Sequence, residues 1–224
     1  MIGRLPARRP EAVGAAAIAA AALILGLLPP TSGQPAAGAS VYTSPPIHGL
    51  VVSAVTGRPV PGAAVFAFWR WRPPDPLFGA IHVSEAVTGA DGTFTLPGWR
   101  RSIERPVDPQ ASGLLVLAPG HASAHASLAT IVPGRRLRIE LPPAAPDPAW
   151  RAERLRDHLP ALIFILAGLP RQPLPKIVDA FVAERDRLPP ELRETLPDRA
   201  GFEWLVNEYR AAFEQAMTGS PSQP

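Results

Sequence analysis

The residues of this sequence best suited to bind a ligand are aromatic and basic, and they lie in two short stretches. One stretch contains Trp69, Arg70, Trp71 and Arg72, and the other contains Trp99, Arg100 and Arg101. An exposed tryptophan beside an arginine can stack on a sugar ring or contact a protein partner. Because tryptophan is usually largely buried, the alternative is that Trp69 and Trp71 belong to a core and the arginines shield strand edges.

Two histidines and three aspartates are further candidates for site residues. His121 and His125 are four residues apart, a spacing that suits two metal ligands on a helix. Their segment has the pattern of a turn and a strand, where residues four apart are widely separated, so we expect a turn or surface pair. Asp75, Asp91 and Asp108 each lie next to Pro or Gly. A role in turns is enough to explain these three aspartates.

Sequence motifs of catalysis are absent. The chain has no Gly-x-Ser-x-Gly, no His-Glu-x-x-His and no glycine-rich phosphate loop. It also has no cysteine, which excludes disulfides and thiolate metal sites. We therefore expect a protein that is not an enzyme and that holds no cofactor and no metal. A hydrolase would need a pocket with three converging His, Asp or Glu side chains.

Composition and charge indicate a globular chain without affinity for nucleic acid. Of the 224 residues, 46% are hydrophobic, which is enough for one sizeable core. The net charge is +3, and the first eleven residues contribute +2 of it through three arginines and one glutamate. The remaining +1 is too small to favour nucleic-acid binding.

Residues 1–39 have the features of a signal peptide. Three arginines precede an uncharged apolar run at residues 12–28. Ala37-Gly38-Ala39 fits the small-x-small cleavage pattern, which would leave Ser40 as the new N-terminus. The alternative is an uncleaved inner-membrane anchor formed by residues 12–28, although this run is slightly short and rich in Ala. We expect an exported protein, periplasmic or secreted, that contacts the membrane only through this segment if it is uncleaved.

Residues 47–143 show short strands separated by turns, a spacing that predicts a β-sandwich. The expected strands are 47–55, 63–71, 81–87, 93–96, 114–117, 124–131 and 136–141. We expect a hairpin around Asp91-Gly92 and a long irregular loop from Pro97 to Gly113.

The strand at 63–71 alternates in a way that assigns its two faces. One face carries Val65, Ala67, Trp69 and Trp71, and the other carries Ala64, Phe66, Phe68 and Arg70. Both faces are apolar near the middle of the strand, so we expect its outer face to be covered as well.

Four motifs in this region resemble one family. They are Ile47-x-Gly49-x-Val51, Thr56-Gly57-x-Pro59-Val60-x-Gly62-Ala63-x-Val65, Thr88-x-x-Asp91-Gly92-x-Phe94-x-Leu96 and Leu115-Val116-x-Ala118-Pro119-Gly120. Together they resemble the carboxypeptidase regulatory-like family. The resemblance implies a seven-stranded transthyretin-like, prealbumin-type sandwich, which serves as a non-catalytic accessory part of exported or surface proteins. The sequence departs from the family at His121, where an aromatic residue is usual, and in the insertion at 97–113.

Residues 146–217 are expected to form three or four short helices that pack on the sandwich. Asp147-Pro148 predicts an N-cap followed by Pro at the first helical position. We expect helices at 148–158, 159–169 and 176–188, and a last helix that Asp198 caps. The apolar run at 159–169 is half the length of a membrane span, which favours a buried helix over a membrane-dipping one.

The helices have one apolar face each, and the economical interpretation is that they cover Phe66 and Phe68. Residues 40–46 are then a linker and 218–224 a disordered tail. The sequence as a whole predicts an exported, non-enzymatic envelope protein that acts as a structural or protein-interaction module. Its partner would be another envelope protein or a glycan. The alternative is a carbohydrate-binding module that uses the Trp and Arg residues.

Overall fold

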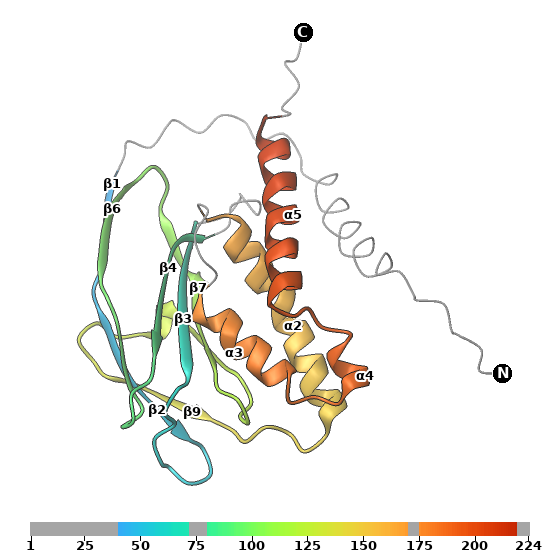
Figure 1. The fold of residues 1–224 in the computed structure, drawn as a ribbon. Coiled ribbons are helices and arrows are strands. Elements are labelled where there is room, and N and C mark those ends of the chain that lie inside the picture. Colours follow the sequence, from blue (N-terminus) through green and yellow to red (C-terminus); the bar gives the residue numbers. More distant parts are fainter. Residues whose placement is uncertain (1–39, 72–79, 170–174, 219–224) are drawn as a thin grey trace, which may run out of the picture. The chain divides into compact units, whose positions relative to one another are not determined.

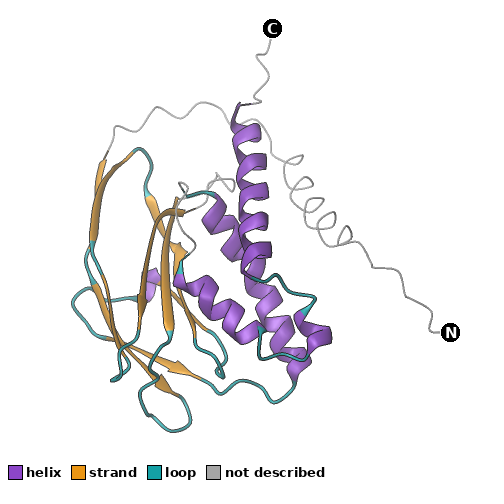
Figure 2. Ribbon diagram, viewed as in Figure 1, coloured by secondary structure: helices purple, strands orange, loops and turns teal. Residues whose placement is uncertain are grey.

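The computed structural model describes residues 40–71, 80–169 and 175–218. Within these residues the chain is mainly β up to residue 141 and helical from residue 148 (Figures 1 and 2). The expected signal peptide or anchor, the residues Arg72 and Asp75, and the tail from residue 219 lie outside the described residues.

Nine strands in the described part of the chain form three sheets. The two-stranded sheet pairs β1 (Ser40–Ser44) with β6 (Trp99–Ile103). The three-stranded sheet has the order β5 (Thr93–Leu96), β2 (Ile47–Ser53), β9 (Leu137–Leu141). The four-stranded sheet has the order β4 (Ala80–Val87), β3 (Ala64–Trp71), β7 (Val107–Leu117), β8 (Ala124–Ser127).

The three-stranded and four-stranded sheets share one apolar core. Val51, Leu96 and Leu141 from the first sheet are fully buried in the same cluster as Val65 and Val116 from the second. Full burial of such a side chain contributes about 1.5–3 kcal/mol relative to leaving it exposed. The β part is therefore sandwich-like, with its core between two sheets.

Strand β3 separates this core from a second one. Val65, Ala67 and Trp69 lie in the core between the sheets, whereas Ala64 and Phe66 lie in a cluster shared with the helices. The predicted assignment of the two faces is confirmed, and so is the expected cover on the outer face. Alternation predicts this correctly because successive side chains of a strand point to opposite sides.

The hairpin expected at Asp91-Gly92 is wrong. Strand β4 belongs to the four-stranded sheet, whereas β5 pairs with β2 in the other sheet. The turn itself is present, because Asp91 Oδ1 accepts hydrogen bonds from the N–H and the hydroxyl of Thr93. Thr88 lies between the end of β4 and this turn, and its hydroxyl donates a hydrogen bond to the Val60 carbonyl. The connection therefore crosses from one sheet to the other.

The expected linker at 40–46 and the expected loop at 97–113 are also wrong. Residues 40–44 form β1, which pairs antiparallel with β6 from Ser40 opposite Ile103 to Ser44 opposite Trp99. Residues 107–113 are the first part of β7 rather than a loop. Strand β6 has the sequence Trp-Arg-Arg-Ser-Ile, which lacks apolar alternation, so pairing rather than side-chain pattern defines it.

The helical part begins with α2 (Pro148–Ala167) and α3 (Lys176–Arg185), followed by α4 (Pro190–Arg193) and α5 (Arg199–Thr218). Both predicted caps are confirmed, because Asp147 Oδ1 accepts from the N–H of Ala149 and Asp198 Oδ1 accepts from that of Gly201. None of the helices described combines the length and the apolar composition that a membrane span requires.

The expected division into a helix at 148–158 and another at 159–169 is wrong, because α2 is continuous through Pro160. A proline inside a helix removes the hydrogen bond to the carbonyl four residues earlier, here that of Arg156. Pro160 and Arg156 are both exposed, so water can hydrogen-bond that carbonyl. Most of the apolar run is buried as expected, with Leu162, Ile163 and Leu166 in the helix-side core.

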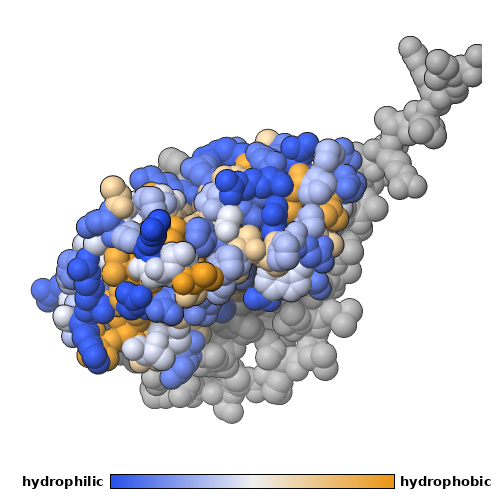
Figure 3. All heavy atoms as spheres, turned by 90° about the horizontal axis from the view of Figure 1, so that it is seen from below, coloured by the Kyte–Doolittle hydropathy of each residue, from blue (hydrophilic) through white to orange (hydrophobic). Residues whose placement is uncertain are grey.

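The helices cover the outer face of the four-stranded sheet. Phe66 and Leu115 from the sheet are buried in one cluster with Ile177 and Phe181 of α3 and Leu162 of α2. Helix α3 contacts β3, β4 and β7, and it runs obliquely to β3 (Figure 1). On the face of the molecule seen in Figure 3, polar side chains interrupt the remaining apolar areas. The predicted packing of the helices over Phe66 is therefore present.

Candidate ligand-binding site

A pocket opens where the turn after β7 meets the first half of α2 and the second half of α3. Its volume is about 40 Å³. Since one water molecule needs roughly 10–15 Å³ by the same measure, the pocket holds one small chemical group. Its apolar lining consists of four alanines and two leucines: Leu117, Ala118, Ala122, Ala144, Leu155 and Ala180.

The turn that forms one wall of the pocket requires glycine at its tip. Gly120 has a φ of 82°, which disfavours residues with a side chain. A Cβ atom there would lie 2.8 Å from Nη1 of Arg187. The turn closes with a hydrogen bond of 3.0 Å from the N–H of His121 to the carbonyl of Ala118. The motif Ala118-Pro119-Gly120 therefore places His121 at the pocket wall.

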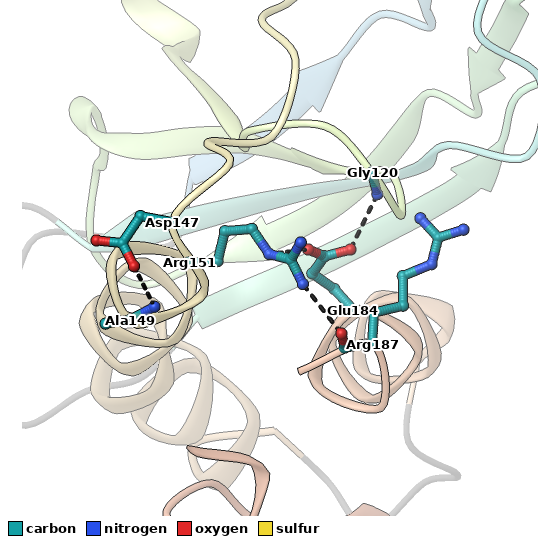
Figure 4. Close-up of polar contacts among 6 residues, drawn as sticks. All are labelled: Gly120, Asp147, Ala149, Arg151, Glu184 and Arg187. Atoms are coloured by element: carbon teal, nitrogen blue, oxygen red, sulfur yellow. Dashed lines mark hydrogen bonds and ion pairs between the residues drawn. The ribbon is translucent and has the colours of Figure 1, made fainter. Parts of the chain in front are cut away.

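One carboxylate joins this turn to both helices (Figure 4). Glu184 Oε2 accepts a hydrogen bond of 2.9 Å from the N–H of Gly120, and Glu184 Oε1 lies 3.3 Å from Nε of Arg151. Arg151 Nη2 also donates to the carbonyl of Arg187 at 3.2 Å. Within the described part of the chain Arg151 Nε makes no hydrogen bond, so the pair is held by charge rather than by a linear contact.

A serine and a histidine face each other inside the pocket. Ser123 Oγ and His158 Nε2 are 2.6 Å apart. Burial lowers the pKa of His158, and the positive charges of Arg154 and His125 lower it further, against a smaller raising effect of Asp157. His158 is therefore uncharged at neutral pH when the pocket is empty.

A hydrogen-bonded serine and histidine are one part of a nucleophilic site, which also needs N–H donors for an oxyanion and a group that orients the histidine. The backbone N–H groups that precede Ser123 are all engaged: Gly120 donates to Glu184, His121 to Ala118 and Ala122 to Pro142. Within residues 40–71, 80–169 and 175–218 no three His, Asp or Glu side chains gather as a metal site would require. The N–H groups of Gly120, His121 and Ala122 are therefore not available to an oxyanion.

The rim of the pocket carries an aromatic ring and a cation. The guanidinium carbon of Arg154 lies 5.4 Å from the ring centre of Trp150, and Trp150 is 41% exposed. Arg154 Nη1 also lies 3.4 Å from Asp157, and both of these side chains are about half exposed, at 50% and 55%. This ion pair is weak, because water screens exposed charges.

The sequence contains a signal for this site that the predictions above do not include. Trp150, Arg154 and His158 are spaced four residues apart, which places them on one face of α2, and all three line the pocket. The opposing wall, at Ala118 to Ser123, could not be assigned to them from sequence, because tertiary packing alone brings the two together.

Those of the predicted tryptophans and arginines that lie within the described residues do not form one exposed surface. Trp69 is 2% exposed and lies in the core between the sheets, where Trp71 and Trp99 pack against it half-buried. Arg70 points to the opposite face of β3, and its guanidinium carbon lies 5.3 Å from the ring centre of Phe164. The core interpretation is therefore correct for Trp69.

Strand β6 carries the exposed members of the set, Arg100 and Arg101. Arg101 Nη1 donates to the carbonyl of Ile81 at 3.4 Å. Trp99, the first residue of β6, contacts two residues that were not among the predicted site residues. Its ring centre lies 5.0 Å from that of Tyr42 and 4.6 Å from that of His82. Burial raises the pKa of Tyr42, and burial together with Arg101 lowers the pKa of His82.

The two histidines considered as a metal pair have separate surroundings. His121 lines the pocket, and its Nδ1 is buried with no hydrogen-bond partner among the described residues. His125, on β8, packs against Phe68 with ring centres 6.2 Å apart.

In comparisons with protein-family models, curated proteins and solved structures, the chain matched none of them.

Proposed function

We propose that this protein is an exported, non-enzymatic interaction module of the bacterial envelope, and that it binds through the pocket between the sheet and the helices. We further propose that its sandwich is of the transthyretin-like, carboxypeptidase regulatory-like type. The observation that carries the proposal is the row Trp150, Arg154 and His158 on α2, which faces a small apolar pocket.

The size of the pocket supports binding of one group of a larger partner. Sites for whole small molecules enclose roughly 300–1,000 Å³, which is far more than the volume available here. The alanine lining provides room for a group the size of a methyl or ethyl, while the polar rim can orient it. A partner that presents such a group from a protein or a glycan fits this pocket.

A matched pair of substitutions tests this function. Ala122→Leu fills the pocket, and Ala129→Leu adds the same side chain at an exposed position outside it. The full chain and both variants are immobilised and exposed to a solubilised envelope fraction. We expect a partner that the wild type and Ala129→Leu retain and that Ala122→Leu loses. Equal retention by all three proteins, or retention by none, would contradict the proposal.

Export is tested separately by cell fractionation with N-terminal sequencing. A periplasmic or secreted chain that begins at Ser40 supports a cleaved signal peptide. A membrane-bound chain that begins near Met1 supports an inner-membrane anchor instead. A cytoplasmic chain would overturn export.

Carbohydrate binding at β1 and β6 is the second candidate, favoured by the contact of Tyr42 with Trp99 beneath the exposed Arg100 and Arg101. Soluble peptidoglycan fragments should then quench tryptophan fluorescence saturably. The quenching should persist in Trp150→Phe and disappear in Trp99→Phe. Its loss in Trp150→Phe instead would move glycan binding to the pocket.

A further inference from the structure

We propose, on the basis of the proposed binding function, that the pocket takes a carboxylate attached to a short apolar group, with Arg154 as its counter-ion. Two sources present this chemistry: the C-terminus of a peptide that ends in a small residue, and a free short-chain acid.

The charges around the pocket favour an anion. Its lining contains two arginines and one glutamate, which leaves a net charge of +1 with the histidines neutral. The glutamate is already used, because Glu184 binds the N–H of Gly120 with one oxygen and faces Arg151 with the other. Arg154 is the remaining cation of the lining, and its exposed ion pair with Asp157 is weak because water screens both charges. An incoming carboxylate can therefore recruit Arg154 at little cost.

A hydroxyl group also lines the pocket. The Ser123 hydroxyl faces His158, and a carboxylate oxygen placed between Ser123 and Arg154 can accept from the hydroxyl. The groups that set the charge of His158 are Arg154, Asp157 and His125, while the Arg151–Glu184 pair and His121 also line the wall. A bound anion opposes the repulsion from Arg154 and His125, so carboxylate binding is expected to raise the pKa of His158.

The alanine lining sets the size of the apolar group. Ala118, Ala122, Ala144 and Ala180 form most of the apolar lining of the pocket, and its volume of about 40 Å³ suits a small apolar group such as a methyl or ethyl. Trp150 stands at the rim and is 41% exposed, so a peptide that continues outward can lie against it. A free acid would gain nothing from Trp150, and this difference separates the two sources.

The test measures the affinity of the full-length protein for four probes by calorimetry. The probes are N-acetyl-Ala-Ala, its C-terminal amide, propionate and propionamide. We expect each acid to bind at least about tenfold more tightly than its amide. Tighter binding of the dipeptide than of propionate by about tenfold identifies a peptide C-terminus, and equal affinities identify a free acid.

Two arginine variants on the same helix complete the test. Arg154→Gln removes the proposed counter-ion, whereas Arg156→Gln changes an exposed arginine that does not line the pocket. We expect Arg154→Gln to weaken binding of the acids by about tenfold or more and Arg156→Gln to leave it unchanged. Circular dichroism confirms that both variants are folded. A histidine NMR titration should show the pKa of His158 rising when the acid saturates the pocket.

Equal affinity for acids and amides, or unchanged binding in Arg154→Gln, would overturn the proposal. If no probe binds while Ala122→Leu still loses its envelope partner, the carboxylate assignment is wrong and the pocket remains the binding site. If Ala122→Leu also retains every partner, the binding function itself fails.

Discussion

The carboxylate of Glu184 on α3 accepts a hydrogen bond of 2.9 Å from the backbone N–H of Gly120, 64 positions earlier in the chain. Arg151 on α2 approaches the other carboxylate oxygen, so one side chain connects the sheet to two helices. Because both side chains of the ion pair are largely buried, with exposed fractions of 20% and 11%, removing one of them leaves the other charge buried without its partner.

Replacing Glu184 should therefore lower stability more than replacing an exposed glutamate. Glu184→Gln keeps an acceptor for Gly120 but leaves Arg151 without its counter-charge, and we expect a loss of about 1–3 kcal/mol in the free energy of unfolding. Glu208→Gln, on the exposed face of α5, should change it by no more than about 0.5 kcal/mol. Urea denaturation compares the two. Equal losses would show that the contact has no net effect.

The buried hydroxyl of Thr88 offers a second test. It donates to the carbonyl of Val60 at 2.7 Å and accepts from the N–H of Ala63 at 2.8 Å. Thr88→Val preserves the shape but leaves both backbone groups unpaired, which should cost about 1–3 kcal/mol. Thr88→Ser keeps the hydroxyl and should lose less. Denaturation experiments compare the free energies of unfolding of the two variants. If Thr88→Val is as stable as Thr88→Ser, the hydroxyl makes no net contribution and the prediction is wrong.

Two glycines with similar backbone angles should respond differently to alanine. Gly57 and Gly92 have φ angles of 66° and 72°. A Cβ at Gly92 would lie 2.6 Å from the Val51 carbonyl oxygen, whereas no described atom lies within 4 Å of one at Gly57. We expect Gly57→Ala to cost about 1–2 kcal/mol from its backbone angle alone. Gly92→Ala should cost more, and thermal denaturation of the two variants would expose the prediction as wrong if the order were reversed.

The stability of the protein should fall on acidification. Burial lowers the pKa of His158 in the folded state below its ordinary value of 6.5, so the unfolded chain binds a proton first. The free energy of unfolding therefore decreases as the pH falls through 6.5, and the loss is complete below the folded-state pKa. Urea midpoints at several pH values should decrease less in His158→Gln than in the wild type. His82, whose pKa is also lowered, contributes in the same direction.

A shortened chain that ends at Pro143 should lose solubility. It lacks all four helices described, which cover Phe66, Leu115 and Leu117 on the outer face of the sheet. An apolar surface of this kind promotes association. Size-exclusion chromatography with light scattering should find aggregates. A monomeric, folded fragment would show that the sheet does not depend on its helical cover.

The sequence predicted correctly the features that depend on residues close together in the chain. The alternation of Val65 and Phe66 assigned both faces of β3 correctly, because period two is a property of the strand itself. The caps at Asp147 and Asp198 were predicted for the same reason, since each bonds an N–H two or three residues later.

Features that depend on distant partners could not be predicted in this way. Strands β1 and β6 have little alternation, and their pairing joins Ser44 to Trp99 across more than fifty residues. The separation of β4 from β5 follows from the bonds of Thr88 to Val60 and Ala63 rather than from the Asp91-Gly92 turn. The pocket likewise needs α2 to be placed against the turn at Gly120, which only the folded chain shows.

The parallel pairing of β2 with β9 sets an order of events during synthesis. Gly49 lies opposite Leu137, so the open side of β2 stays unpaired until residues near Leu141 have left the ribosome. At a chain growth of about 5–20 residues per second, that interval lasts roughly 5–20 s. During this interval one backbone edge of an apolar strand lacks its partner, and such an edge can pair with another chain. The topology of one sheet thus delays closure of this strand edge until the last strand of the β part has been made.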